Sequence, residues 1–480
     1  NQSVLYGTKY RMINGIGSLG FHGRYITDLE AGTLRAVYFK QSFPGVGQVD
    51  SILLAEANTN FKKLLAKEYY SYIHSSIPLD AGPIGTSWIL PQTKSVDKMY
   101  KGVIAYTSRE TYTYDQFGNV TLLENQPDIS DPVHVLYTGA EYLNDTLNWN
   151  IGKLLHKKYS KSSKIQFDSW NSLSDLSWDK YAYDDNANKS MESNYSDHES
   201  KWLDHAYRYN DYGNVVCSTD FLGGTEILSY DPLQCFITER KVPTSKGDTL
   251  VVMSTYDPAF GTLTSTTDAN AQRTTYEIDG LGRTTGMYSP APSGDLVKVA
   301  AYGLLSMDGL SIYKTQKRTS WTDDDINNWF WSYEVKDGFN NTLKELSLGD
   351  KGDTIAIIHK YDNQNLKIAE SLPLSTGDTD TIWTEFTHDI YGNVDTIKTD
   401  LSVTAFQINP KNNSITKTIS TNTGLERVTV TYYTPSGKID HIIDAEGGET
   451  QYYYDLLDRE ILIRDPSKIV TNIKYNSLGD

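Results

Sequence analysis

The stretch 433–480 reads YTPSGKIDHIIDAEGGETQYYYDLLDREILIRDPSKIVTNIKYNSLGD, and it contains the pattern that decides the fold. Tyr433, Tyr454 and Tyr475 are 21 residues apart, and the same interval separates the first and last tyrosines of 209–231, YNDYGNVVCSTDFLGGTEILSYD. Each interval divides again, because an aspartate follows the tyrosine by 11 residues and precedes the next unit by 10. A double spacing held this tightly indicates a repeat architecture.

One unit of the repeat predicts two turns and two short strands. The motif Y-D-x-x-G-N/R/K places glycine and asparagine where a tight turn needs positive φ. A β-prone run follows, and then D-x-x-G forms a second turn in which the aspartate side chain can bond the backbone ahead of it. The return run 449–454 alternates with period two, which puts one set of side chains on each face of a sheet. Each unit is therefore expected to be a β-hairpin that buries its apolar face only against its neighbours.

Looser copies of the motif extend the repeat over much of the chain. They are YDQFGNVT at 114–121, YDPAFGTL at 256–263, YDNQNLKI at 361–368, HDIYGNVD at 388–395 and a degenerate YEVKDGFNNT at 333–342. The sequence thus predicts an all-β fold in which hairpins form one long, spiralling antiparallel sheet. The residues expected to carry this structural signature are Tyr114, Asp115, Gly118, Tyr209, Gly213, Asp220, Tyr230, Asp231, Tyr256, Asp257, Asp268, Asp279, Gly282, Arg283, Gly392, Gly437, Asp444, Tyr454, Asp455, Asp465 and Tyr475.

Tyrosine is unusually frequent, with 35 tyrosines against 13 phenylalanines. The tyrosine ring packs on a pleated surface while its hydroxyl stays wet or finds a partner. This preference fits an enclosing wall with two partly wet faces. The alternative is that the rings form a platform for stacking sugars.

The chain divides into three expected segments. Residues 1–106 lack clean repeats but contain strand-like runs, and 50–68 is interpreted as strand–turn–strand although a helical stripe is the alternative. Residues 107–208 hold a first repeat with a polar, irregular insertion at 160–204, including a loop near 184–200. Residues 209–480 form the main repeat region, with a second insertion near 290–332.

Composition limits the classes of partner. With 44 Lys plus Arg and 61 Asp plus Glu, the net charge is −17, which disfavours nucleic acid and anionic lipid surfaces. No apolar run is long enough to span a bilayer, and no signal peptide is expected in this excerpt. Cys217 and Cys235 are the two cysteines, which excludes a disulfide framework. Because the sequence starts at Asn1 and stops at Asp480 within a pattern, it is expected to be an excerpt of a longer protein.

No catalytic, cofactor-binding or metal-binding constellation is predicted. The nine histidines never pair at zinc-ligand spacing. The glycines of GIGSLG at 15–20 have the dinucleotide-binding spacing but no βαβ context, so a loop beside a strand is expected. The repeat aspartates could be imagined as glycosidase carboxylates, but they recur in every unit, so a turn role is preferred. The acidic run 323–325 is interpreted as a solvated loop, with calcium binding as the alternative.

The repeat resembles the tyrosine–aspartate (YD) repeat of the Rhs proteins, a family that includes teneurins and bacterial polymorphic toxins. The YD pattern covers roughly 110–480. A narrower resemblance, to the middle region of the B components of insecticidal toxin complexes (an SpvB/Rhs-type shell), rests on two segments. They are GFHGRYITDLEAGTLRAVYFKQSFPGVG at 20–47 and EYLNDTLNWNIGKLLHKKY at 141–159.

The resemblance implies a hollow β-sheet cocoon that encloses a cytotoxic C-terminal polypeptide in a secreted bacterial toxin. Its implied partners are the rest of the Rhs shell (the C component) with the enclosed polypeptide, and a pore-forming A component. In this family a β-propeller docks the B component on the pore, and neither that propeller nor the self-cleaving Rhs-core terminus is expected in these residues. The expected function is therefore a shell segment without enzymatic activity. A cell-surface YD-repeat adhesin is the alternative, and an ADP-ribosyltransferase is disfavoured because no E-x-E string occurs.

Overall fold

The structure is a computed structural model of the whole chain. It describes residues 2–6, 10–13, 17–28, 33–42, 45–57, 61, 63–76, 87–100, 103–307, 309–322, 324–350, 352–375, 378, 380–389, 392–409 and 412–479.

The N-terminal part is built of strands. The described strands are β1 (Gln2–Tyr6), β2 (Tyr10–Ile13), β3 (Gly17–Phe21), β4 (Gly23–Asp28), β5 (Thr33–Phe39), β6 (Val49–Glu56), β7 (Leu64–Ser76), β8 (Ser87–Tyr100) and β9 (Val103–Tyr114). The two strands predicted within 50–68 are present, since β6 and β7 pair antiparallel, and the predicted turn residues 58–60 lie outside the described residues. The expectation of a loop at 15–20 is wrong for Gly17–Phe21, which forms β3, and residues 15 and 16 lie outside the described residues.

The middle of the chain continues the same meander. Its strands are β10 (Val120–Gln126), β11 (Leu136–Asp145), β12 (Asn150–Ser160), β13 (Asp175–Tyr183), β14 (Lys189–Ser196), β15 (Lys201–Tyr209), β16 (Val215–Thr219), β17 (Thr225–Tyr230), β18 (Ile237–Pro243), β19 (Thr249–Tyr256), β20 (Leu263–Thr267), β21 (Arg273–Ile278), β22 (Thr284–Pro290), β23 (Leu296–Met307) and β24 (Leu310–Lys317).

The C-terminal part follows without a change of architecture. After the 3₁₀ turn Ile326–Asn328 come β25 (Phe330–Lys336), β26 (Thr342–Leu348), β27 (Thr354–Tyr361), β28 (Lys367–Ser371), β29 (Leu374–Ser375), β30 (Trp383–His388), β31 (Val394–Lys398), β32 (Ser402–Asn409), β33 (Ser414–Thr421), β34 (Glu426–Tyr433), β35 (Ile439–Ile443), β36 (Glu449–Tyr454), β37 (Glu460–Arg464) and β38 (Val470–Asn472). That 3₁₀ turn is the one helical element among the described residues.

Both predicted insertions are largely wrong. Within 160–204 only 161–174 leaves the sheet, because β13, β14 and most of β15 continue the strand pairing and 184–188 is a tight turn. Within 290–332 only 318–329 leaves the sheet, since β23, β24 and β25 pair in order. The polar and serine-rich composition of 160–204 misled the first prediction, because strands with two wet faces tolerate polar side chains on both. The second prediction rested on the lack of repeat motifs between 276 and 333 and on the acidic run 323–325, and strands continue there without the motif.

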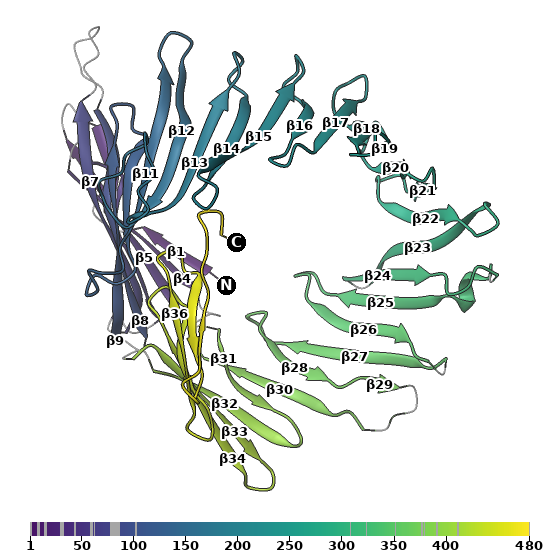
Figure 1. Ribbon diagram of the computed structural model, residues 1–480. Coiled ribbons are helices and arrows are strands. Elements are labelled where there is room, and N and C mark those ends of the chain that lie inside the picture. Colours follow the sequence, from purple (N-terminus) through teal and green to yellow (C-terminus); the bar gives the residue numbers. More distant parts are fainter. Residues whose placement is uncertain are drawn as a thin grey trace.

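In the described part of the chain, 36 strands join one antiparallel sheet and β2–β3 form a separate hairpin. Each strand pairs with its neighbours in sequence, apart from the local pairings β1–β4 and those around β27–β30. The sheet is not closed by strand pairing. It curls into a ring around an open centre (Figure 1). The prediction of a long, curved, antiparallel all-β sheet is confirmed.

Consecutive antiparallel pairing sends alternate turns to opposite margins of the sheet. We call one margin the tyrosine rim: it carries the turns at 115–119, 184–188, 210–214, 231–236, 257–262, 279–283, 337–341, 362–366, 434–438 and 455–459. The other margin, the opposite rim, carries the turns at 220–224, 244–248, 268–272, 291–295, 421–425, 444–448 and 465–469. The two turn motifs of the repeat are thereby separated in space.

The wall has almost no conventional core. Nine apolar residues of the described chain are buried, and among them only Trp178 and Trp329 are large aromatic side chains. The accessible surface is 29268 Å². A compact monomer of 54.0 kDa exposes about 18,000 Å² by the usual scaling with mass. The excess arises because much of the sheet is wet on both faces.

Candidate functional site

The nine predicted aspartates all lie in turns, where their carboxylates accept hydrogen bonds from backbone amides. Asp220 accepts from the N–H groups of Leu222 and Gly224 at 2.9 and 2.8 Å. Asp444 does the same in its own turn, at 3.0 and 2.7 Å. The other seven accept from at least one backbone N–H between two and five residues further on: Asp115, Asp231, Asp257, Asp268, Asp279, Asp455 and Asp465.

These hydrogen bonds change the acidity of some turn carboxylates. The side chain of Arg283 donates to Asp279 at 2.7 Å, and this bond, with the amide bonds of the turn, lowers the pKa of Asp279. Burial raises the pKa of Asp115, but hydrogen bonds from Asn119 and its neighbours outweigh burial, so that pKa is also lowered. Both carboxylates are thus held in the charged form that accepts the turn bonds.

The repeat tyrosines tie neighbouring strands together at the tyrosine rim. The hydroxyl of Tyr230 donates to the carbonyl of Val215 at 2.8 Å, and that of Tyr209 donates to Lys189 at 2.7 Å. Each bond links the end of one strand to the start of the previous strand, where no tyrosine-rim turn connects the two. A bond from the hydroxyl to a carbonyl of the previous strand, although not always between strand ends, is also made by Tyr72, Tyr114, Tyr142 and Tyr183.

These hydroxyls explain why tyrosine is used instead of phenylalanine. Burial raises the pKa of Tyr114, Tyr209 and Tyr230, as expected for hydroxyls in a partly desolvated site. This bonding role was not predicted from the sequence. The signal that could have indicated it is a tyrosine at the last position of a strand before the turn. Among the other predicted tyrosines, Tyr256 stacks on Phe236 with centroids 5.0 Å apart, and Tyr475 lies 4.8 Å below the Arg459 guanidinium.

Some glycines of the tyrosine rim are more closely surrounded than the positive-φ glycines of the opposite rim. The predicted Gly118, Gly213, Gly282, Gly392 and Gly437 all have positive φ, between 76° and 87°. At the tyrosine rim a Cβ on Gly282 would also lie 2.4 Å from the side chain of Phe260 in the preceding turn. At the opposite rim a Cβ on the positive-φ glycines would meet nothing within 4 Å: Gly223, Gly247, Gly294, Gly352, Gly424 and Gly447.

Two more glycines show close contacts between neighbouring tyrosine-rim turns. A Cβ on Gly261 would approach Phe236 to 2.9 Å, and one on Gly152 would approach Asn119 to 2.7 Å. The turns are also linked by hydrogen bonds such as the one from Asn341 to Asn365, at 3.0 Å. Several tyrosine-rim turns therefore pack on their neighbours, although a Cβ on Gly437 would meet nothing within 4 Å. Turns of the opposite rim are also linked in places, since the N–H of Asn422 donates to the carbonyl of Leu401 at 3.1 Å.

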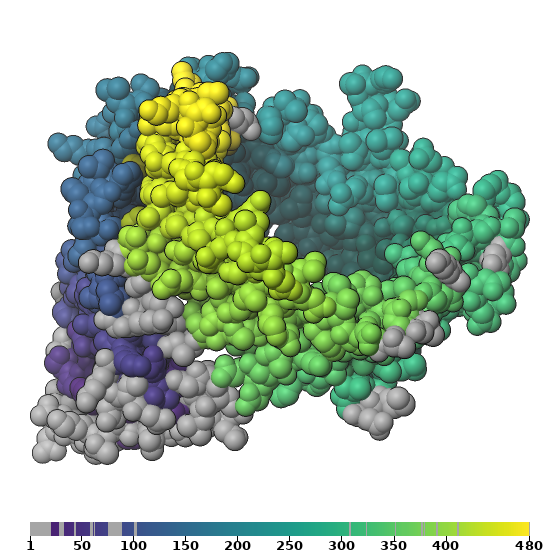
Figure 2. Space-filling view, turned by 90° about the horizontal axis from the view of Figure 1, so that it is seen from below, coloured from purple at the N-terminus to yellow at the C-terminus, as the bar shows by residue number. Residues whose placement is uncertain are grey.

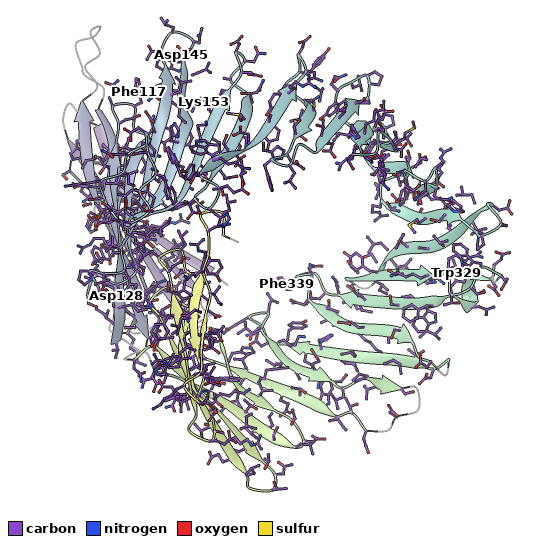
Figure 3. The ribbon with its side chains drawn as sticks, in the orientation of Figure 1. Phe117, Asp128, Asp145, Lys153, Trp329 and Phe339 are labelled. Carbon is purple, nitrogen blue, oxygen red and sulfur yellow. The ribbon has the colours of Figure 1, made fainter. Side chains whose placement is uncertain are left out.

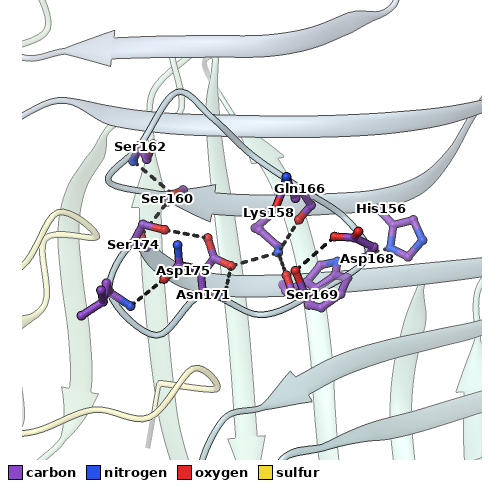
Figure 4. Close-up of polar contacts among 12 residues, drawn as sticks. His156, Lys158, Ser160, Ser162, Gln166, Asp168, Ser169, Asn171, Ser174 and Asp175 are labelled. Carbon is purple, nitrogen blue, oxygen red and sulfur yellow. Dashed lines mark hydrogen bonds and ion pairs between the residues drawn. The ribbon is translucent and has the colours of Figure 1, made fainter.

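A buried ion pair fastens the loop 161–174 to the sheet (Figure 4). Lys158 is fully buried, and its Nζ lies 2.9 Å from Asp175, also buried. The same ammonium donates to the backbone carbonyls of Gln166 and Ser169 at 2.6 and 2.7 Å and lies 3.9 Å from the ring centroid of Trp178. All three ammonium protons thus have acceptors, which compensates the burial of the charge.

Aromatic side chains surround this fastening. Trp178 contacts Tyr195 and Trp202 with centroids 5.7 and 4.7 Å apart, and Trp170 of the loop lies 5.2 Å from Tyr195. Beside them, a shallow hollow of about 390 Å³ opens to solvent between the loop and the sheet, lined by Glu141, Gln166, Phe167 and Asp168.

The C-terminal turn closes the ring by a contact that is not strand pairing. Ser477 N–H donates to the carboxylate of Asp197 at 2.8 Å, and Asp197 N–H donates to the hydroxyl of Ser477 at 3.0 Å. The same hydroxyl donates to the carbonyl of Tyr195. Burial raises the pKa of Asp197, but the bonds from Ser477 outweigh it and the net shift is downward. We call this contact the seam; it joins residues about 280 positions apart.

The curled sheet surrounds a hollow. At about 4.8 Å per strand, the 24 strands β15 to β38 between the two sides of the seam extend about 115 Å, enough for a ring roughly 37 Å across. The space-filling view shows a deep recess between the wall 200–300 and the C-terminal strands (Figure 2). Phe339, in the tyrosine-rim turn between β25 and β26, lies beside the open centre, and Trp329 lies at the outer end of β25 (Figure 3).

The acidic run predicted as a loop is partly described. Asp324 pairs with Arg318 at 2.6 Å, and Asp325 caps the 3₁₀ turn through Asn327 N–H at 2.9 Å; residue 323 lies outside the described residues. Among the described residues no group of three or more His, Cys, Asp or Glu is placed to hold a metal ion. No helix in that part of the chain is long and apolar enough to cross a membrane.

Comparison with solved structures identifies the architecture. The crystal structure of TcdB2-TccC3 is similar over 97% of this chain and 34% of that chain, with a TM-score of 0.71 and 11% sequence identity. The chain has the fold of a toxin-complex shell. A second TcdB2-TccC3 structure, without the hypervariable C-terminal region, gives a TM-score of 0.66 at 12% identity, over 97% of this chain and 36% of that one.

The Photorhabdus luminescens Tc holotoxin pore is also similar, with a TM-score of 0.64 at 11% identity over 99% of this chain and 38% of that one. This chain thus spans about a third of the length of the chains it matches. No family model matches the sequence, and no curated protein does. The resemblance to an Rhs-type shell is confirmed for the fold.

Proposed function

We propose that this chain is a wall segment of a toxin shell that encloses a cytotoxic polypeptide and keeps it from the solvent until delivery. The observation that carries the proposal is the thin, curled sheet, whose 29268 Å² of accessible surface far exceeds that of a compact protein of its mass. A single wet sheet with nine buried apolar residues in its described part gains little by curling around itself. Curling serves a purpose when the space inside holds a guest.

The charge of the wall suits a polypeptide guest. The net charge of −17 gives a weak, non-specific attraction to a positively charged chain and little affinity for nucleic acid. The proposed role is structural: the turn aspartates hold turns, and no enzymatic activity or cofactor is assigned to the chain. The proposed partners are the rest of the shell with its enclosed polypeptide and a pore-forming component, in an exported bacterial toxin complex.

Protease protection tests the enclosure. The complete protein that contains this chain would be prepared with its toxic polypeptide, and the polypeptide's half-life under protease would be measured. We expect at least a tenfold longer half-life than for the same polypeptide free in solution. The matched control adds the polypeptide to a preassembled shell from outside, where it should stay digestible. Equal half-lives in all three samples would refute the enclosure.

A surface-binding role is the second candidate, and exposed turn tips favour it. Leu147, Trp149, Tyr212, Leu233 and Leu281 at the tyrosine rim are between 69% and 95% exposed. Exposed apolar groups in a row are typical of an interaction surface. A glycan and cell-binding screen with the purified chain tests this role. Binding that is lost on Tyr212→Ala and Leu233→Ala, without any protected guest, would favour the adhesin over the shell.

A further inference from the structure

The seam joins two parts of the sheet, around β14 and after β38, that are not paired with each other as strands. The strand order runs along the chain, and β38 pairs with β37 through Val470, Thr471 and Asn472. Beyond β38 the chain leaves the sheet and reaches Tyr195 and Asp197, which lie at the opposite rim where β14 turns into β15. In the part of the chain that the structure describes, the ring is therefore completed by a few hydrogen bonds between turns, and no strand pairing joins its two sides.

The receiving side of the seam is rigidly built. The ring of Tyr195 lies within 5.2 to 5.7 Å of the rings of Trp170, Trp178 and Trp202. Trp178 in turn lies over the fully buried Lys158, which holds the loop 161–174 to the sheet. The carbonyl of Tyr195 and the amide of Asp197 are thus presented from a fixed surface.

The approaching side is held at one point. Arg459 donates to the carbonyl of Asn476 at 3.2 Å, lies over the ring of Tyr475 and pairs with Asp455 at 2.7 Å. In contrast, β38 has three residues, all exposed. Ser477 is 7% exposed even though β38 is exposed throughout, because the seam itself buries it.

We propose that the seam is a releasable clasp: the turn at 476–479 fastens the ring to the turn at 195–200, and its release opens the wall without unpairing any strand. Every strand pairing of the sheet is left intact when the three seam bonds break. A single serine supplies two of the three bonds through its hydroxyl, so few groups decide between the fastened and released ring. As a gate for the guest, the clasp rests on the proposed enclosing function; as a fastening of the ring, it does not.

The clasp is tested by measuring a distance across the seam in the complete protein. Nitroxide labels would be placed at the exposed positions Glu199 and Lys474, with Cys217→Ala and Cys235→Ser to remove other thiols. The parent should give one narrow distance distribution. Ser477→Ala removes both hydroxyl bonds and should raise the population of longer distances about fivefold for each bond lost.

Ser436→Ala is the matched control. Ser436 lies in the tyrosine-rim turn 434–438 and donates to Asp458 at 2.8 Å, so its loss removes a turn-to-turn bond that does not cross the seam. We expect the parent distance distribution and an unchanged circular dichroism spectrum for this variant. If Ser477→Ala and the double variant with Asp197→Ala both keep the narrow parent distribution, the clasp is refuted.

Protease protection of the guest separates the clasp from the enclosing function. Broadened distances together with faster digestion of the guest in Ser477→Ala would support a clasp that gates the chamber. Broadened distances without any protection in the parent would support the clasp as a fastening and overturn enclosure. Unchanged distances with normal protection would overturn the clasp and leave enclosure standing.

Discussion

The substitution Gly282→Ala distinguishes two reasons for a glycine in these turns, which are the positive φ and the close approach of the neighbouring turn. Gly282 has a φ of 76°, and Gly294 of the opposite rim has a φ of 89°, so Gly→Ala forces a left-handed alanine at both positions. That conformation costs about 1–2 kcal/mol. At Gly282 the new Cβ would also lie 2.4 Å from Phe260, whereas at Gly294 it meets nothing within 4 Å. Overpacking of this kind adds about 1–3 kcal/mol.

The assay must resolve one part of a long array, because repeats open locally. We therefore expect amide hydrogen exchange around 256–290 to report about 2–5 kcal/mol lost for Gly282→Ala, the sum of the two costs. Gly294→Ala should lose only about 1–2 kcal/mol. Adding Phe260→Ala should restore the packing part in a double-mutant cycle. Equal losses at the two glycines, or no coupling to Phe260, would show that the tyrosine-rim turns do not support each other.

Three further outcomes are expected. Tyr230→Phe should cost about 0.5–1.5 kcal/mol by losing its bond to β16, whereas Tyr453→Phe, whose exposed hydroxyl reaches only a side chain, should cost less in the same chemical denaturation. Asp444→Ala should cost about 0.5–2 kcal/mol of stability without loss of any activity, because it removes the turn bond from Gly448. The control is Glu446→Ala, on the exposed tip of the same turn. An Asp444→Ala variant that stayed stable but lost a reaction would contradict the turn role. The folded-state pKa of Asp279 lies below its ordinary value of 3.8. The stabilisation by this carboxylate is therefore complete above pH 3.8 and is lost as the pH falls through the folded-state pKa. Asp279→Asn should make the protection of amides in the turn 279–283 against hydrogen exchange independent of pH in this acid range.

The sequence predicted the hairpins because their causes are local. A turn needs positive φ at Gly437 and a carboxylate at Asp444, and both requirements are written in residues a few positions apart. Period-two alternation then fixes the strands. The insertion at 160–204 was wrong because its polar composition was taken to mean irregular structure, whereas a sheet with two wet faces accepts polar side chains. The insertion near 290–332 was wrong because the strands continue where the repeat motif is absent. Composition predicts loops well only where one face of each strand is buried.

What the sequence could not predict depends on contacts between units. Phe260 and Gly282 are 22 positions apart, and nothing in either turn alone says that one packs on the other. The seam is a more extreme case, because Ser477 and Asp197 meet only after the twist of the 24 intervening strands, β15 to β38, has accumulated. A small change in twist per strand, summed over the ring, would separate these two turns by many ångströms. Ring closure is therefore a property of the whole sheet, and hydrogen bonds at the seam can fasten a ring that curvature has already brought together but cannot draw an open one shut.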